Sequence, residues 1–219
     1  MCLKLIKRNS PIVVYSVMGI RNLMSIIKKH CDESVYNNIT QLQNLPKPEG
    51  VLVSKVAVDT SILLYKYRHA CSLSSNKDLH ITGFINRVVF YLSSKMVPIF
   101  VFDGKPPDEK SQTLEARKEQ KERTERNIKE LQDKIDNAKE TDDKSSMISQ
   151  LEALRSSVVY VTREHFEDVR TVLKLMGIMY FDPSEYNMGG EAEHICSTLQ
   201  KKGVVDHVVS DDTDSFAFG

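Results

Sequence analysis

Short apolar runs alternate with amphipathic stretches along most of this chain, and that alternation limits the folds it can adopt. The runs expected as buried strands are mostly β-branched or aromatic and fall at residues 55–59, 97–102, 178–181 and 207–210. The stretches with apolar residues at helical spacing fall at residues 61–67, 81–95, 162–176 and 193–202. Such alternation predicts an α/β fold whose mostly parallel sheet is flanked by helices.

Acidic residues follow the predicted strands at the points where they end. Asp59 closes the first strand, Asp103 comes directly after the second, and Asp211 begins an acidic group after the fourth. Parallel strands place their carboxyl ends at one edge of the sheet, which is where sites form in open α/β folds. We therefore expect these acidic side chains to meet at that edge.

Two pairs of acidic residues lie in the last thirty or so residues, and the two members of each pair can point to one site only if the backbone has a particular conformation. Glu191 and Glu193 would point roughly 200° apart on a regular helix, so they converge only if Glu191 precedes the first helical turn. The preceding pair, Gly189 and Gly190, permits that irregular backbone. Asp212 and Asp214, two residues apart in an extended segment, would face the same way.

Carboxylates in this arrangement indicate a site for hard divalent cations, which prefer oxygen ligands. Two such ions about 3.5–4 Å apart would suit hydrolysis of a phosphodiester. Taken singly, each acid has a simpler explanation: the helix dipole favours Glu191, and turn chemistry favours Asp211. His194 is expected at the surface or behind the ligands, and Cys196 is expected in the core.

The balance of charge argues mildly against a nucleic-acid binder. The 219 residues include 30 basic and 30 acidic ones, so the formal net charge is zero, whereas nucleic-acid binders are usually basic. The objection weakens if the acids are gathered at a metal site and the basic residues lie elsewhere. None of the four cysteines forms a C-x-x-C pair, which favours a reducing, intracellular setting. No apolar run approaches the ~18 residues that span a membrane.

Three segments stand apart from this pattern. Residues 1–17 look detached from the rest of the chain, and residues 31–50 are polar and expected to be irregular. Residues 111–154 are rich in Glu, Lys, Arg and Gln and contain no Gly or Pro, which favours helix. We expect two helices, joined near residues 141–145, that project as a hairpin. On charge pattern alone, a solvated helix pair or a partly disordered insert fits as well.

Five motifs in order resemble the flap endonuclease/XPG-type structure-specific 5′ nucleases and cover nearly the whole chain from Met18. They are MGIRNL from Met18, VAVDTSILLY from Val56, FVFDGKPPDEKSQTLEARKE from Phe100, MGIMYFDPSEYNMGGEAEH from Met176 and VVSDDTDSFAFG from Val208. The FDGKPP run is most similar to the flap endonuclease branch. The resemblance implies a PIN-like (Rossmann-like) α/β fold with an inserted, charged helical arch through which a free 5′ single strand passes.

The resemblance also implies a division of the chain and a set of site residues. Residues 1–17 would be an N-terminal extension, 18–108 and 161–219 the two nuclease regions, and 109–160 the helical gateway and arch. The metal ligands, for two Mg²⁺ ions with Mn²⁺ as a substitute, would be Asp59, Asp103, Glu191, Glu193, Asp212 and Asp214. The gateway residues on the scissile phosphate would be Lys110 and Arg117, and the further DNA contacts Tyr65, Lys121 and Gly19.

The chain departs from the family at both ends. Family members begin at the position of Met18, near the DNA-binding face. They continue past the position of Gly219 into a helix–two-turn–helix element that grips duplex DNA with K⁺, supplies a further aspartate and often leads to a sliding-clamp motif. We expect this chain to be truncated before that element, so that contact with a clamp would need a region not included here. The loop before Val51 and the arch region have unusual content, so contacts that the family makes through loops do not transfer.

The sequence therefore predicts a divalent-metal-dependent nuclease that cuts branched DNA at single-strand/duplex junctions, such as 5′ flaps, in replication and repair. The expected setting is the nucleus or a viral replication compartment, without a membrane. The alternatives are a PIN-type ribonuclease, which would share the acids but not the long arch, and a non-catalytic scaffold. A scaffold would be expected to have lost acids, and all six are present.

Overall fold

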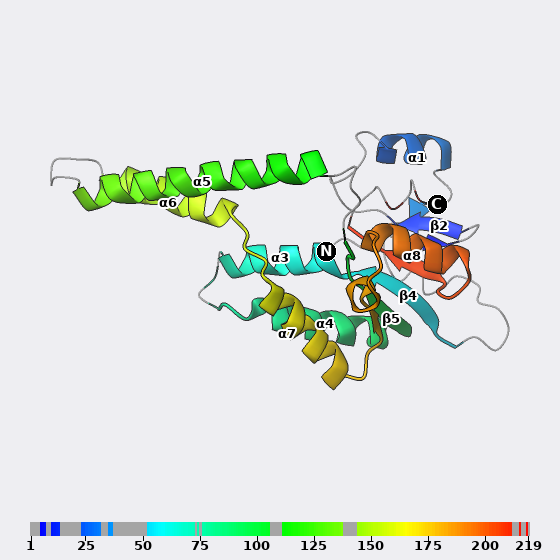
Figure 1. Cartoon of the computed structure of the whole chain (residues 1–219). Coiled ribbons are helices and arrows are strands. Elements are labelled where there is room, and N and C mark those ends of the chain that lie inside the picture. Colours follow the sequence, from blue (N-terminus) through cyan, green and yellow to red (C-terminus); the bar gives the residue numbers. More distant parts are fainter. Residues whose placement is uncertain are drawn as a thin grey trace.

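Four parallel strands form the part of the sheet that carries the acidic residues. In the computed structural model, which describes residues 5–7, 10–13, 23–31, 35–36, 52–72, 74, 76–105, 111–137, 144–211, 215 and 218, these strands lie side by side (Figure 1). Their order is β7 (His207–Val209), β4 (Ser54–Asp59), β5 (Met96–Val101) and β6 (Tyr180–Phe181). All four match predicted strands, and the mostly parallel α/β sheet is confirmed.

Three short strands extend the sheet beyond β7. They are β1 (Leu5–Lys7), β2 (Ser10–Val13) and β3 (Val35–Tyr36). β1 runs antiparallel to β7, with Leu5 opposite Val209, so the expectation that residues 1–17 are detached is wrong. The physical reason is that an uncovered strand edge leaves backbone N–H and C=O groups unpaired, and β1 pairs those of β7. β3 likewise places a strand in a segment that was expected to be irregular.

One face of the sheet is covered by α3 (Thr60–Ser72), α4 (Leu79–Ser93) and α7 (Arg163–Leu175). Successive strand residues point to opposite faces, so Val56 and Val58 face these helices and Ala57 faces away. The fully buried residues of this main core include Leu64, Phe84, Val88, Tyr91, Phe100, Val169 and Leu173. The apolar face predicted for α7 is therefore confirmed. The one predicted within residues 81–95 is partly wrong: Ile85, Val89 and Leu92 are exposed, because α4 turns the side that carries Phe84, Val88 and Tyr91 toward the sheet.

The opposite face is covered by α8 (Ala192–Lys201), which packs Ala192 and Cys196 against Ala57, Val101 and Val208. Gly203 ends α8 in the left-handed region at φ 72°, which the absence of a Cβ permits, as the sequence predicts. The N-terminal helix is α1 (Leu23–Cys31). Among the described helices, none has the length and hydropathy needed to cross a bilayer.

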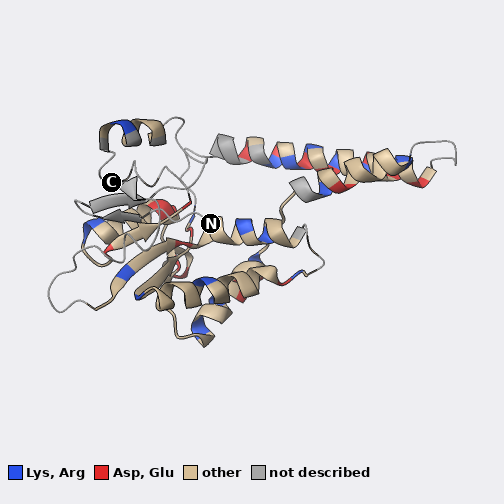
Figure 2. Ribbon diagram, turned by 180° about the vertical axis from the view of Figure 1, so that it is seen from behind, with Lys and Arg blue, Asp and Glu red and all other residues tan. Residues whose placement is uncertain are grey.

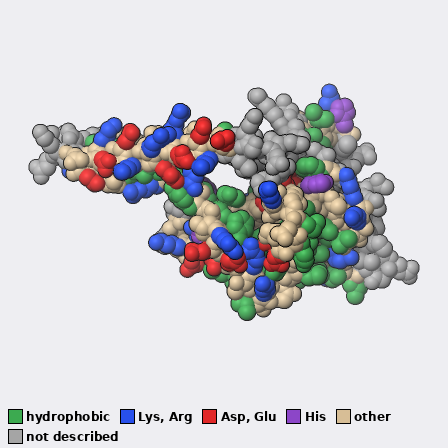
Figure 3. Space-filling view, in the orientation of Figure 1, with side chains coloured by type: hydrophobic (Ala, Val, Ile, Leu, Met, Phe, Trp, Pro, Cys, Tyr) green, Lys and Arg blue, Asp and Glu red, His purple; other side chains and the backbone are tan. Residues whose placement is uncertain are grey.

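The charged segment forms two helices that extend away from the body, α5 (Ser111–Asn137) and α6 (Lys144–Ser157) (Figure 1). They pack side by side, with Arg155 Nη2 donating to Gln132 Oε1 at 2.9 Å. Lys, Arg, Asp and Glu side chains are interspersed along the surface of this hairpin (Figure 3). The predicted helix pair is confirmed, and the connection at 138–143 lies outside the described residues.

Candidate active site

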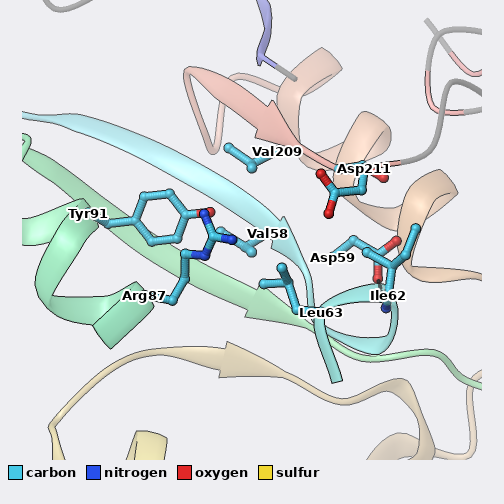
Figure 4. A pocket seen from close by; sticks show the side chains of 9 residues that line it. Val58, Asp59, Ile62, Leu63, Arg87, Tyr91, Val209 and Asp211 are labelled. Atoms are coloured by element: carbon cyan, nitrogen blue, oxygen red, sulfur yellow. Dashed lines mark hydrogen bonds between the residues drawn. The ribbon is translucent and has the colours of Figure 1, made fainter. Parts of the chain in front are cut away.

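Two acidic residues lie side by side where β4 and β7 end. Val58 pairs with Val209 in parallel register, which places Asp59 at the end of β4 next to the segment that leads to Asp211. Both side chains are nearly buried, Asp59 at 4% and Asp211 at 8% exposure. They line one small pocket at this edge of the sheet (Figure 4).

A third acid, Asp103, is joined to the first turn of α8. Its Oδ1 accepts a hydrogen bond from the Ala192 backbone N–H at 2.8 Å, which satisfies one of the unpaired donors at the helix start. Glu191 precedes the helix in an extended conformation, with φ −90° and ψ 146°, and Glu193 lies in its first turn. The condition predicted for convergence of the two glutamates, that Glu191 stands before the first turn, is confirmed.

The buried thiol of Cys196 lies within reach of the charge of three of these carboxylates. Burial raises the pKa of this thiol well above its usual value, and the negative charges of Asp59, Asp103 and Glu193 raise it further. Cys196 lies one turn into α8 with no solvent exposure, so its predicted place in the core is confirmed. Acids from β4, from the segment after β5 and from α8 therefore lie near the same end of α8, and Figure 2 shows acidic residues where α8 begins.

Two basic residues at this edge were not identified from the sequence. Lys66 Nζ lies 3.1 Å from Asp211 Oδ2, and the Lys66 side chain is about half exposed. Arg87, from α4, is buried beneath the strand ends beside Tyr91 (Figure 4), and its Nε donates to the Tyr67 hydroxyl at 3.3 Å. Burial acts to lower the pKa of Arg87, but Tyr91, Tyr67 and Asp211 together raise it above its usual value. No sequence signal pointed to Arg87, because it lies off the apolar face predicted within residues 81–95.

The ion pair between Lys66 and Asp211 leads to a first prediction. Asp211 directly precedes the predicted ligand Asp212, so Lys66→Met should loosen the segment that carries it. Loss of a partner that orients a ligand typically costs about 10- to 100-fold in metal affinity or activity. We expect a shift of this size in the Mg²⁺ concentration that gives half-maximal cleavage, measured by titration. Lys55→Met, at the opposite edge of the sheet, is the control and should leave the midpoint unchanged.

The predicted DNA contacts that the structure describes lie on α3 and α5. Tyr65 is 53% exposed, so it is not a core tyrosine and its ring is accessible. Lys121 places its ammonium 4.3 Å from the centre of the Tyr160 ring, and the Tyr160 hydroxyl donates to Glu125 Oε1 at 2.9 Å. Arg68 Nε in turn donates to the Tyr160 carbonyl at 3.4 Å, so Tyr160 joins α5 to α3. No sequence signal pointed to Tyr160.

Several predicted site residues are not placed by the structure. Asp212, Asp214, Lys110 and Gly19 lie outside the described residues, and Arg117 lies within α5 with its side chain likewise not described. His194 is exposed beside the Phe218 ring, in agreement with its expected surface position. The roles assigned to all of these residues stay predictions.

The chemistry of the donor set fits a hard divalent cation. Among the described residues, no group of three or more His, Cys, Asp or Glu side chains is arranged to hold a metal ion by itself. The described acids at this edge nevertheless offer carboxylate oxygens alone, which suit Mg²⁺ and Mn²⁺. The two aspartates that complete the predicted set, Asp212 and Asp214, lie one and three residues after Asp211 in the chain.

Similarity to known proteins extends over nearly the whole chain. It is 31% identical to the flap endonuclease 1 of Glycine max over 212 residues, which are 92% of this chain and 49% of that protein. The flap endonuclease 1 of Enterocytozoon bieneusi is 32% identical over 210 residues, 92% of this chain and 52% of the relative. The chain thus spans about half the length of the relatives that it matches.

Solved structures give the same relationship. The catalytic core of Rad2 in complex with DNA substrate (complex III) is 26% identical, with a TM-score of 0.53 over 90% of this chain and 46% of that one. The corresponding complex II is 27% identical, with a TM-score of 0.50 over 76% and 42% of the two chains. Residues 18–124 match the XPG N-terminal domain and residues 187–219 the XPG I-region. The chain belongs to the flap endonuclease/XPG family.

Proposed function

We propose that this chain carries the catalytic site of a divalent-metal-dependent, structure-specific 5′ nuclease that hydrolyses branched DNA near single-strand/duplex junctions. The observation that carries the proposal is geometric: Asp59 ends β4, Asp103 accepts from the first turn of α8, and Glu193 lies in that turn, in a chain of this family. The Rad2 catalytic cores, which were solved in complex with DNA substrate, support DNA as the substrate class. Its proposed setting is the nucleus or a viral replication compartment.

The acidic residues at the carboxyl ends of the strands and at the start of α8 would hold the metal ions. The arch would supply positive charge to the scissile phosphate. Asp103, Glu191 and Glu193 would hold one ion, and Asp212 and Asp214 the other, with Asp59 between the two groups. When bound, such ions supply the Lewis acidity that activates a water and neutralises charge on the phosphoryl group. Asp59 and Asp103 are held in place by backbone donors, Ile62 N at 3.3 Å and Ala192 N at 2.8 Å, so their oxygens are oriented in advance.

The proposed gateway residues act on the scissile phosphate from the arch. Lys110 directly precedes α5 and Arg117 lies seven residues further along, so a helical path would bring both onto one stripe. A guanidinium matches two phosphate oxygens at once and stays charged at every working pH. These residues would stabilise the negative charge that develops on the phosphate during cleavage.

One experiment tests the function directly. The 219-residue chain is incubated with an end-labelled 5′-flap duplex, and separately with single-stranded RNA, in Mg²⁺, in Ca²⁺ and in EDTA. We expect cleavage of the flap substrate near its junction in Mg²⁺ alone. Cleavage of RNA only would instead identify a PIN-type ribonuclease. No cleavage of either substrate, together with no Mg²⁺ binding by calorimetry, would identify a scaffold.

The gateway assignment gives a second prediction. Arg117→Met removes one charged contact from the phosphate, and losing a single such donor typically costs about 10²-fold in kcat. We expect kcat under saturating flap substrate to fall by this amount. Lys129→Met, further along α5, removes an equal charge at an exposed position and is the control. If both variants lose activity equally, the arch acts through its overall charge and Arg117 has no specific role.

A further inference from the structure

An exposed aromatic ring stands beside the acidic edge, on the turn that connects β6 with α8. This turn contains η3 (Pro183–Tyr186), drawn in orange just before α8 in Figure 1. Because β6 runs parallel to β5, with Val101 opposite Phe181, the turn leaves the sheet at the same edge as Asp103. Tyr186 at the end of η3 is 64% exposed, and Met188 is 51% exposed.

The turn is fixed in place on both sides. Asp182 accepts hydrogen bonds from the Ser184 backbone N–H at 2.9 Å and from the Ser184 hydroxyl at 2.6 Å. At the other end, Gly104 N donates to the Gly190 carbonyl at 2.8 Å, which ties the turn to the residue after Asp103. A Cβ on Gly104 would lie 2.6 Å from the Met188 carbonyl oxygen, so this close approach requires glycine.

The Tyr186 ring is stacked on one side and open on the other. Its centre lies 5.8 Å from the centre of the Phe181 ring, and the two planes differ by 13°. Phe181 is itself packed against the core beneath α8, so it supports the tyrosine from below. The ring is thus held at a set orientation, and a second flat ring could stack on the exposed side at little cost in side-chain entropy.

We propose that Tyr186 is a stacking platform for an unpaired nucleobase of the DNA strand that is cut, which rests on the nuclease function proposed above. Every base has a π-face, so a single aromatic platform accepts any sequence, as a structure-specific enzyme requires. Lys105, directly after Gly104, is exposed, and its backbone forms a β-bridge with Gly189 at the end of the same turn. The positive charge of its side chain can therefore contact a phosphate of the DNA backbone. The chemistry therefore fits a single-stranded segment next to the cleavage site.

A fluorescent base tests the platform separately from cleavage. 2-Aminopurine is placed at successive positions of the unpaired strand of a 5′-flap DNA, and binding is followed in Ca²⁺. We expect one position to show quenching with the parent chain and with Tyr186→Phe, and to lose it with Tyr186→Leu, which keeps an apolar side chain. Loss of base–aromatic stacking should also weaken flap binding by about 5- to 150-fold.

Leu175→Ala is the matched control, because Leu175 is 84% exposed at the end of α7, where the chain approaches β6 from the opposite edge. It should leave both quenching and affinity unchanged. If the Tyr186→Leu variant shows the same cleavage, affinity and quenching as the parent chain, the stacking role of Tyr186 is wrong, and the nuclease function is unaffected. If the parent chain itself binds no flap DNA, both proposals fail.

Discussion

Replacement of Asp59 by asparagine should reduce cleavage by about 10³-fold or more while leaving the protein folded. The proposed site relies on carboxylates to hold cations whose charge stabilisation amounts to several kcal/mol, and each 1.36 kcal/mol is tenfold in rate. Asp59 is 4% exposed and lies among other acids, so the amide removes a charge at the centre of the group. The measurement is the single-turnover rate on a labelled 5′-flap duplex in Mg²⁺.

The asparagine preserves the local structure, which separates a loss of function from a loss of fold. Asp59 Oδ1 accepts from the Ile62 backbone N–H at 3.3 Å, and an asparagine Oδ1 can accept the same hydrogen bond. Asp206→Asn is a matched control: Asp206 Oδ2 accepts from the Lys55 backbone N–H at 2.8 Å, at the opposite edge of the sheet. Its rate should stay at the parent level. A parent-like rate in Asp59→Asn would remove Asp59 from the ligand set.

The sheet and its acidic edge could be predicted because they depend on local patterns. Buried parallel strands need uninterrupted apolar runs, and covering helices need one apolar face, so β4 and α7 could both be recognised in the sequence. The positions of Glu191 and Glu193 could also be predicted, and from helix geometry. Helix geometry alone required Glu191 to precede the first turn, and the structure places it there.

Contacts that join distant segments could not be predicted in this way. β1 pairs with β7 across about two hundred residues, and nothing in Leu5–Lys7 specifies that partner. The pair of Lys66 and Asp211 likewise depends on how α3 docks beside β7. Tyr186 carries no sequence signal at all, because its accessibility and its support by Phe181 exist only in the folded turn.

A buried ion pair next to that turn should contribute strongly to stability. Arg170 Nε donates to Asp182 Oδ2 at 2.9 Å, and the two side chains are only 15% and 2% exposed. Asp182→Asn would leave the guanidinium largely buried without its main acid, and removal of one partner from a buried pair costs about 3–5 kcal/mol. For a chain of this size we expect the Tm to fall by about 6–20 °C, measured by calorimetry.

Arg170 also supplies an internal comparison, since it forms a second ion pair. Its Nη1 lies 3.1 Å from Glu167 Oε1, and the Glu167 side chain is 54% exposed. Solvent screens that pair, so Glu167→Gln should cost less than about 1 kcal/mol. The double variant Asp182→Asn with Arg170→Met should recover part of the stability lost in Asp182→Asn, because it removes the unpaired buried charge. Equal costs for the two acids would mean that burial does not determine the strength of this pair.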